Sequence, residues 1–150
     1  EKCRMAMDHG AELCINYRDR DFVPEVKAAT GGEGVGLVMD GVGKDTFDGS
    51  LDCLKPLGMM ISFGNASGPV PPVSMLTLAQ KGSIKITRTT LFTFLSDHAR
   101  AQAMAQHLFG KVASGDIKVN IGQTFPIERI VDAHKALEAR ETVGSTVITL

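Results

Sequence analysis

The chain has 150 residues, of which 43% are hydrophobic and 22% are charged, with a formal net charge of -1 at pH 7. This length allows a real core, and the composition is too hydrophobic and too weakly charged for a disordered protein. The near-zero charge argues against a broad basic surface for nucleic acid or anionic lipid, and no apolar run approaches the roughly 20 residues of a membrane helix.

The three cysteines, Cys3, Cys14 and Cys53, are odd in number and contain no Cys-x-x-Cys pair. This pattern indicates neither a disulfide framework nor a zinc knuckle. The four histidines lack the spacing of a helical zinc site with an intervening Glu. We therefore expect buried free thiols in a reducing cytoplasm, and no metal site.

The first 40 residues predict two helices and two strands. Residues 1–10 have helical spacing but neither a cap nor a preceding strand, so we expect a fragment of a longer protein. The apolar stretch Leu13–Tyr17 is expected to be a strand, and Phe22–Ala29 a helix. Val35–Asp40 is a near-continuous apolar run, which predicts a strand buried on both faces.

The middle of the chain continues the alternation. Apolar residues at helical spacing predict a helix over residues 44–54, which a Pro-Leu-Gly turn ends. A buried strand at residues 59–63 is followed by a loop rich in Gly, Ser and Pro at residues 64–72. A short helix over residues 74–80 and a strand at Ser83–Arg88 complete this part.

The last third predicts a helix from Ser96 to Gly115, a short extended segment at residues 117–119, a helix opened by Pro126 and a strand at residues 145–150. Alternating strands and helices are typical of an α/β fold with a parallel sheet covered on both faces. Right-handed crossovers leave few topologies, of which the doubly wound dinucleotide-binding fold is the commonest.

Ligands in such sheets bind beyond the carboxyl ends of the strands, so the turns that follow strands are the candidate sites. Residues 16–18 offer a Tyr for an adenine and an Arg for a phosphate. Residues 40–43 offer glycines that let a ligand approach the backbone. Residues 63–69 offer small residues and a side-chain amide for a nicotinamide. Each could instead be an ordinary turn. The glycine run at residues 31–36 lies before a strand, which predicts a structural turn.

Four motifs occur in a characteristic order: Ile15-Asn16-Tyr17-Arg18, Asp40-Gly41-Val42-Gly43-Lys44-Asp45-Thr46, Ser50-Leu51-Asp52-Cys53-Leu54-Lys55-Pro56 and Phe63-Gly64-Asn65-Ala66-Ser67-Gly68. Shorter matches follow at residues 80–83, 87–88, 108–109, 114–115 and 133–140. The ordered set resembles the NADPH:quinone oxidoreductases of the zeta-crystallin type, in the medium-chain dehydrogenase/reductase superfamily. The resemblance covers nearly all of the chain, although no single motif is decisive.

The resemblance implies NADPH as the cofactor. It places Lys2 at the 2′-phosphate, Tyr17 on the adenine side and the Phe63–Ser67 turn beside the nicotinamide. Arg88 and Arg140 match arginines near the cofactor, although either alone would read as a surface charge. The full implied set is Lys2, Tyr17, Gly41, Val42, Phe63, Gly64, Asn65, Ala66, Ser67, Arg88 and Arg140. Two positions depart from the pattern, because Gly41 stands where Ser is common and Thr89 where Pro is usual.

Several parts of the family's fold are missing from this sequence: the glycine-rich pyrophosphate loop with its strand, the second strand and the amino-terminal catalytic domain. We therefore expect a partial Rossmann-type doubly wound sheet, with residues 1–150 an incomplete dinucleotide-binding domain and residues 117–150 returning toward the absent catalytic domain. In the sheet order 3-2-1-4-5-6 the strand Leu13–Tyr17 loses its neighbours, so we expect it to be orphaned, re-paired or paired with another chain.

The implied function is zinc-independent, NADPH-dependent reduction of quinones or similar conjugated carbonyls by the complete protein, with the isolated fragment inactive. Two alternatives stay open: an enoyl or enone reductase of the same superfamily, and a non-catalytic crystallin-like or RNA-binding relative. The resemblance also implies a cytoplasmic homodimer that pairs through Ser83–Arg88.

Overall fold

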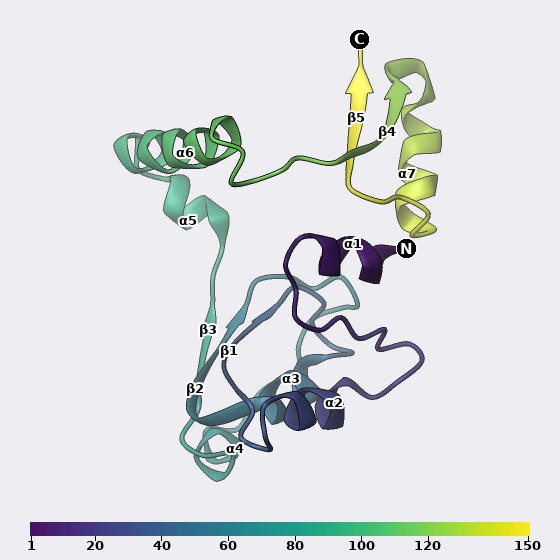
Figure 1. Ribbon diagram of the computed structural model, residues 1–150. Helices are drawn as coiled ribbons and strands as arrows, with labels where there is room; N and C mark the ends of the chain where they lie inside the picture. Colours follow the sequence, from purple (N-terminus) through teal and green to yellow (C-terminus); the bar gives the residue numbers. More distant parts are fainter. The chain divides into compact units, whose positions relative to one another are not determined.

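A computed structural model describes residues 1–150 (Figure 1). The chain divides into two compact units, Cys3–Thr93 and Phe94–Leu150, with Glu1 assigned to the first and Lys2 to the second. Each unit contains a parallel sheet of its own. None of the helices is long and apolar enough to cross a membrane.

The elements alternate along the chain, and the side chains of Asp21, Ser74 and Asp97 cap three of the helices by accepting a backbone N–H hydrogen bond from the first turn. Up to Leu95 the order is α1 (Lys2–Asp8), α2 (Phe22–Ala29), β1 (Val35–Asp40), α3 (Phe47–Asp52), β2 (Leu54–Ser62), α4 (Met75–Gln80), β3 (Lys85–Arg88) and α5 (Leu91–Leu95). After it come α6 (His98–Ala113), β4 (Ile121–Pro126), the 3₁₀ helix η1 (Ile127–Arg129), α7 (Ile130–Glu138) and β5 (Ser145–Thr149).

The sheet of the first unit has the order β1-β2-β3, with both pairs parallel. Its register sets Asp40 opposite Ser62 and Ser62 opposite Arg88, so the three strands end on the same rung. The loops that follow the three strands therefore leave from one edge of the sheet. This arrangement confirms the expected α/β class with a parallel sheet.

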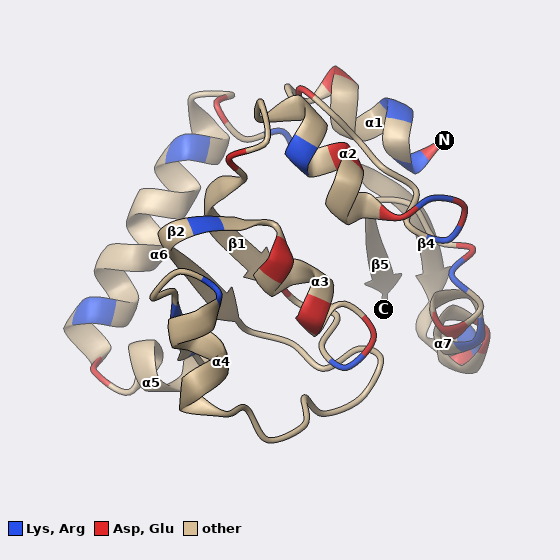
Figure 2. Cartoon of the chain, turned by 90° about the horizontal axis from the view of Figure 1, so that it is seen from below, with Lys and Arg blue, Asp and Glu red and all other residues tan.

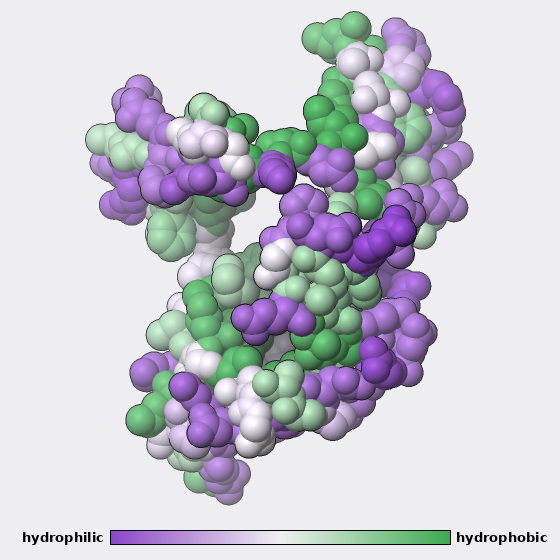
Figure 3. All heavy atoms as spheres, viewed as in Figure 1, coloured by the Kyte–Doolittle hydropathy of each residue, from purple (hydrophilic) through white to green (hydrophobic).

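The core of this unit lies between α3 and one face of the sheet. Its buried members are Phe47, Leu51, Leu54, Met60 and Ile84. The other face of β1 is open, because the side chains of Leu37 and Met39 are 50% and 65% exposed. The expectation of a strand buried on both faces is therefore wrong for β1: α3 covers one side of it, and apolar atoms remain on the surface of this unit (green in Figure 3).

The strand expected at Leu13–Tyr17 does not form. Residues 11–16 are irregular and belong to neither sheet. A strand needs a neighbour to accept and donate its backbone hydrogen bonds, and this segment pairs with no strand of the sheet β1-β2-β3. The segment is thus left without a ladder, which is the orphaned outcome among those expected.

Other boundaries also differ from those expected. The helix over residues 44–54 is shorter, because the N–H groups of Thr46 and Phe47 both donate to the Gly43 carbonyl in a turn that delays α3. The strand at residues 59–63 begins earlier, at Leu54, and α5 was not expected. Pro126 ends β4 instead of opening a helix directly, and residues 117–119 lie outside β4.

The second unit pairs β4 with β5 in parallel, and α7 packs against β4. Basic and acidic residues are interspersed along both units (Figure 2). Exposed ion pairs such as Arg129–Asp132 and Lys111–Asp116 join charges that lie close in sequence.

We expect Leu51→Ala to lower the free energy of unfolding by about 3 kcal/mol, because it removes a side chain that is only 2% exposed and leaves a cavity between α3 and the sheet. The matched change Leu76→Ala, at a leucine 64% exposed on α4, should cost below about 1 kcal/mol. Urea denaturation of the chain and both variants measures the difference. Equal losses at the two positions would contradict the core described here.

Candidate functional site

Asp40, the last residue of β1, organises the turn that follows it. Its side chain is buried, with 5% of the residue exposed. Oδ1 accepts hydrogen bonds from the N–H groups of Val42 (2.8 Å) and Gly43 (2.9 Å). Oδ2 accepts from the hydroxyls of Thr46 (2.8 Å) and Ser50 (2.7 Å). One carboxylate therefore joins the end of β1 to the turn and to the start of α3.

These contacts also decide the charge of Asp40. Burial would by itself raise the pKa of the carboxyl, but the hydrogen bonds from Gly43, Ser50, Thr46 and Val42 outweigh burial and lower the pKa below its ordinary value. The carboxylate is charged at neutral pH, and its donors belong to the chain itself. Asp40 therefore acts as an anchor for the turn.

The loop after β2 is hydrogen-bonded to the turn after β1. The N–H of Phe63 donates to the Asp40 carbonyl (2.9 Å), and the N–H of Ser67 donates to the Val42 carbonyl (2.8 Å). The Ser67 hydroxyl donates to the same Val42 oxygen (2.9 Å) and accepts from the N–H of Asp45 (3.0 Å). The two loops thus form one continuous surface at the edge of the sheet.

Glycines allow the two loops to approach this closely. A Cβ added at Gly64 would overlap the carbonyl oxygen of Gly41. At Gly43, whose φ of 91° already favours glycine, an added Cβ would lie 2.6 Å from the carbonyl oxygen of Gly68. The sequence suggested that these glycines make room for a ligand. The structure shows that they are also required for the two loops to pack against each other.

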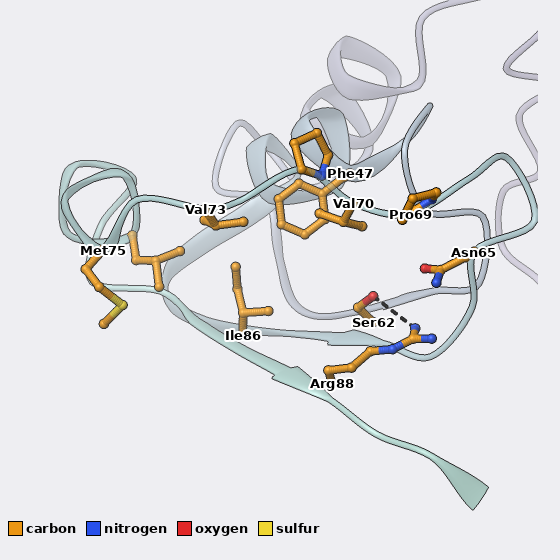
Figure 4. A pocket seen from close by; sticks show the side chains of 11 residues that line it. Phe47, Ser62, Asn65, Pro69, Val70, Val73, Met75, Ile86 and Arg88 are labelled. Atoms are coloured by element: carbon orange, nitrogen blue, oxygen red, sulfur yellow. Dashed lines mark hydrogen bonds between the residues drawn. The ribbon is translucent and has the colours of Figure 1, made fainter.

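A hollow of about 460 Å³ opens beside this edge (Figure 4). The Arg88 guanidinium lies at its rim, where Nη1 donates to the Ser62 hydroxyl (3.4 Å) and to the Gly64 carbonyl (3.3 Å). Asn65 also lines the hollow, and its side-chain amide makes no hydrogen bond within the chain. The remaining lining is apolar and comes from α3, the loop after β2, α4 and β3: Phe47, Pro69, Val70, Pro71, Val73, Met75, Leu78 and Ile86.

A smaller hollow of about 150 Å³ lies at the end of β1. Tyr17 and Phe22 form one side of it, with their rings edge to face at a centroid distance of 6.4 Å. Residues 39–42 at the end of β1 form the other side. The three turns singled out from the sequence, at Tyr17, Gly41–Gly43 and Phe63–Ser67, therefore lie at one edge of the sheet of the first unit.

Two of the expected site residues lie in other parts of the chain. Lys2 is the exposed first residue of α1, and Arg140 is an exposed residue that follows α7 with a positive φ of 60°. Sequence reasoning missed the anchoring role of Asp40 and its partners Thr46 and Ser50. The available signal was an Asp at the end of an apolar run, followed by a hydroxyl residue just before the next helix and another about one turn into that helix.

We expect Asp40→Ala to cost about 3 to 5 kcal/mol of unfolding free energy, because it removes a buried charge that accepts four hydrogen bonds, three of them buried. The lowered pKa of Asp40 also makes stability depend on pH. Its contribution is fully present above the unfolded-state value, near 3.8, and is lost as pH falls through the lower folded-state value.

Denaturation of the chain from pH 7 to pH 2 should therefore show a loss below about pH 4 that is reduced in Asp40→Asn. Asp48→Asn, at an exposed carboxylate on α3, is the matched control and should keep the acid profile of the original chain. An identical acid profile for the original chain and Asp40→Asn would contradict the anchor.

Comparison with known proteins places the chain in a family. Residues 9–148 match the family model described as zinc-binding dehydrogenase. The quinone oxidoreductase of Pseudomonas aeruginosa is 45% identical over 148 residues, which is 99% of this chain and 46% of that protein. The 2-haloacrylate reductase of a Burkholderia species is 38% identical over 149 residues, or 99% of this chain and 45% of that protein.

Solved structures agree with this match. The crystal structure of Escherichia coli quinone oxidoreductase complexed with NADPH superposes with a TM-score of 0.92 at 41% identity, covering 98% of this chain and 46% of that one. A mycobacterial protein complexed with NADPH gives a TM-score of 0.92 at 40% identity, covering 99% of this chain and 47% of that one. The chain spans about half the length of the relatives it matches.

The family's description refers to zinc. No group of three or more His, Cys, Asp and Glu side chains comes together in a way that could hold an ion. The residues of this chain thus do not fit a zinc site. The match over residues 9–148, the identities of about 40% and the shared fold show that the chain belongs to the zinc-binding dehydrogenase family, beside its quinone oxidoreductases.

Proposed function

We propose that this chain supplies much of the NADPH-binding surface of a reductase, with the cofactor lying across the edge where β1, β2 and β3 end. The observation that carries the proposal is the joined pair of loops at that edge. Asp40 anchors the first loop, and hydrogen bonds of Ser67 connect the second loop to the first. Open parallel sheets bind ligands at such an edge, and the structures of two similar proteins are described as complexes with NADPH.

The residues at this edge fit one end of the cofactor. The side-chain amide of Asn65 is free of partners within the chain, so it can bind the carboxamide of a nicotinamide or a ribose hydroxyl. Gly64, Ala66 and Ser67 keep the adjacent backbone accessible at low steric cost. Arg88 adds a positive charge at the rim, where it can meet a phosphate or a polar oxygen.

The remaining contacts belong to the other end of the cofactor. Tyr17 offers an exposed ring face beside the backbone of Gly41 and Val42, which suits an adenine or a ribose. Lys2 is assigned to the 2′-phosphate that distinguishes NADPH from NADH, and Arg140 to a further position near the cofactor. Both are exposed cations able to contact an anionic ligand.

NADPH, when bound, supplies the hydride for the reaction. The part played by this chain is to orient it. The Phe63–Ser67 turn holds its position through hydrogen bonds to the loop after β1, and the apolar walls around Phe47, Val70 and Ile86 keep water from one side. The substrate pocket and any proton donor belong to the complete protein.

For the complete protein we propose NADPH-dependent reduction of a quinone or a similar conjugated carbonyl, without zinc, in the cytoplasm. A second candidate is an electron-poor conjugated alkene, because one relative with 38% identity is a 2-haloacrylate reductase. Steady-state assays with a quinone and with a 2-haloacrylate, each before and after chelation of zinc, distinguish the two. Loss of activity on chelation would contradict the zinc-independent proposal.

We expect Lys2→Ala in the complete protein to raise the Kd for NADPH about tenfold and to leave the Kd for NADH nearly unchanged. A charge-assisted contact to the 2′-phosphate is worth roughly 1.5 to 3 kcal/mol, and NADH has no such phosphate. Fluorescence titration of each nucleotide against the original protein and the variant measures both constants.

Lys55→Ala is the matched control, because Lys55 is an exposed cation at the opposite end of the same sheet from the joined loops. It should leave both constants unchanged. If the original protein binds RNA tightly at physiological salt and neither nucleotide, the non-catalytic alternative replaces the reductase proposal. Equal effects of Lys2→Ala on NADPH and NADH would remove Lys2 from the 2′-phosphate site.

We further propose a homodimer that forms through Ser83–Arg88. The strand β3 within this segment pairs with β2 on one side only and is an edge of its sheet. Pairing two such edges across a two-fold axis would satisfy their backbone groups. Sedimentation of the complete protein at about 10 μM should give a dimer, because weak self-association is visible in the micromolar range. A monomer at that concentration would contradict the pairing.

A further inference from the structure

Gly41 and Phe63 are neighbours where β1 and β2 end. The register sets Met39 opposite Ile61. Gly41 and Phe63 each follow two residues later, which puts them on the same face of the sheet as that pair. The N–H of Phe63 donates to the Asp40 carbonyl (2.9 Å), so the two backbones are still paired at this point. The ring of Phe63 therefore lies beside a position that carries no side chain.

Contact distances show how closely the ring approaches Gly41. A Cβ added at Gly41 would lie 3.0 Å from both Cε2 and Cζ of Phe63, and 3.8 Å from Cδ2. The two shorter distances are below the separation of about 3.5 Å at which carbon atoms attract each other best. Gly41 does not have a positive φ, so its backbone conformation does not require glycine. Space for the ring is thus what favours glycine at this position.

The backbone around this contact is held in place on both sides. A Cβ added at Gly64 would overlap the Gly41 carbonyl oxygen, so the two chain segments already touch. Asp40 fixes the turn by accepting two backbone N–H hydrogen bonds from it. The ring of Phe63 is less restrained, because 51% of the residue is exposed. A side chain at position 41 would therefore push the ring outward by a few tenths of an ångström and leave the backbone where it is.

We propose that Gly41 is a positioning residue for hydride transfer, because it lets the ring of Phe63 rest on the turn as an apolar wall for the nicotinamide ring. The inference rests on the proposed function, which puts the nicotinamide end of NADPH beside the Phe63–Ser67 turn. Gly41 supports the far end of the Phe63 ring, and the exposed part remains available to a ligand. Aromatic rings pack well against a second flat ring, either offset or edge to face.

A displaced wall should slow the reaction more than it weakens binding. A misplacement of about 1 Å can cost on the order of 100-fold in rate. Gly41→Ala moves the ring by a few tenths of an ångström, so we expect kcat of the complete protein to fall about fivefold. The Kd for NADPH should stay nearly unchanged, because the contacts to the adenine and the phosphates are not altered. This unequal response separates positioning from a loss of binding.

Phe63→Leu tests whether the effect passes through the ring. Leucine has no atoms in the place of Cε2 and Cζ, the two atoms nearest to the added methyl group. In the Phe63→Leu background, Gly41→Ala should therefore leave kcat unchanged. Gly36→Ala is the control, because it adds a methyl group on β1 where the nearest atom is Cε of the flexible Lys55 side chain, at 3.4 Å. It should match the original protein in both constants.

The complete protein and its variants are compared with NADPH and whichever of the quinone and the 2-haloacrylate the original protein reduces. Absorbance of NADPH gives kcat, fluorescence titration gives Kd, and urea denaturation shows that each variant is folded. If Gly41→Ala does not fold, Phe63→Leu alone decides the question, because removal of the wall must lower kcat with little change in Kd.

The outcomes keep this inference apart from the proposed function. If the original protein binds no NADPH or reduces neither acceptor, the proposed function fails and the inference fails with it. If the original protein is active, the inference alone is overturned by any of three results. These are an unchanged kcat in Gly41→Ala, the same loss of kcat in the Phe63→Leu background, or a change in Kd as large as the change in kcat.

Discussion

The carboxylate of Asp40 is the point on which the geometry of the first unit depends. It ends β1, and its four hydrogen bonds reach forward over the turn and into α3. A buried charge of this kind is stable only when it is satisfied locally, and here every donor comes from the next ten residues of the chain. The turn therefore has a fixed shape before any ligand arrives.

That fixed turn serves as a template for the loop after β2. The parallel register brings Asp40 and Ser62 to the same rung, so the two loops start side by side. Glycines at positions 43 and 64 let the backbones of the two loops come close, and Ser67 hydrogen-bonds to Val42 and Asp45 across the contact. The result is a preorganised edge with an amide and a guanidinium beside an apolar hollow, which reduces the cost of ordering loops on binding.

Much of this fold could be predicted from local pattern. The helix Phe22–Ala29 and the Ser74 cap follow from propensity and capping chemistry, and the order of strands and helices predicts the parallel sheet. The wrong predictions have a common cause: whether a segment pairs and is buried depends on which other segments lie beside it. Leu13–Tyr17 has the composition of a strand but no partner, and Leu37 and Met39 have the composition of a buried strand but only one covered face.

The candidate site was predictable in position and only partly in detail. The turns after β1 and β2 lie at one edge of the sheet, as its parallel topology requires, whereas the turn at Tyr17 follows no strand. The sequence could not show that Gly43 and Gly64 are required where the two loops pack together, because those contacts join residues more than twenty positions apart. Nor could it show that the Asp40 carboxylate binds the turn that follows it, because this depends on how the turn folds.

The central claim is that the loops after β1 and β2 act as one cofactor-binding surface. A crystal structure of the complete protein soaked with NADPH tests it most directly. The account requires the nicotinamide end beside Asn65 and the Phe63–Ser67 turn, with the hydrogen bonds of Ser67 to the first loop unchanged from those described here. Density for the dinucleotide at any other edge of the sheet, or loops that separate to admit it, would contradict the account.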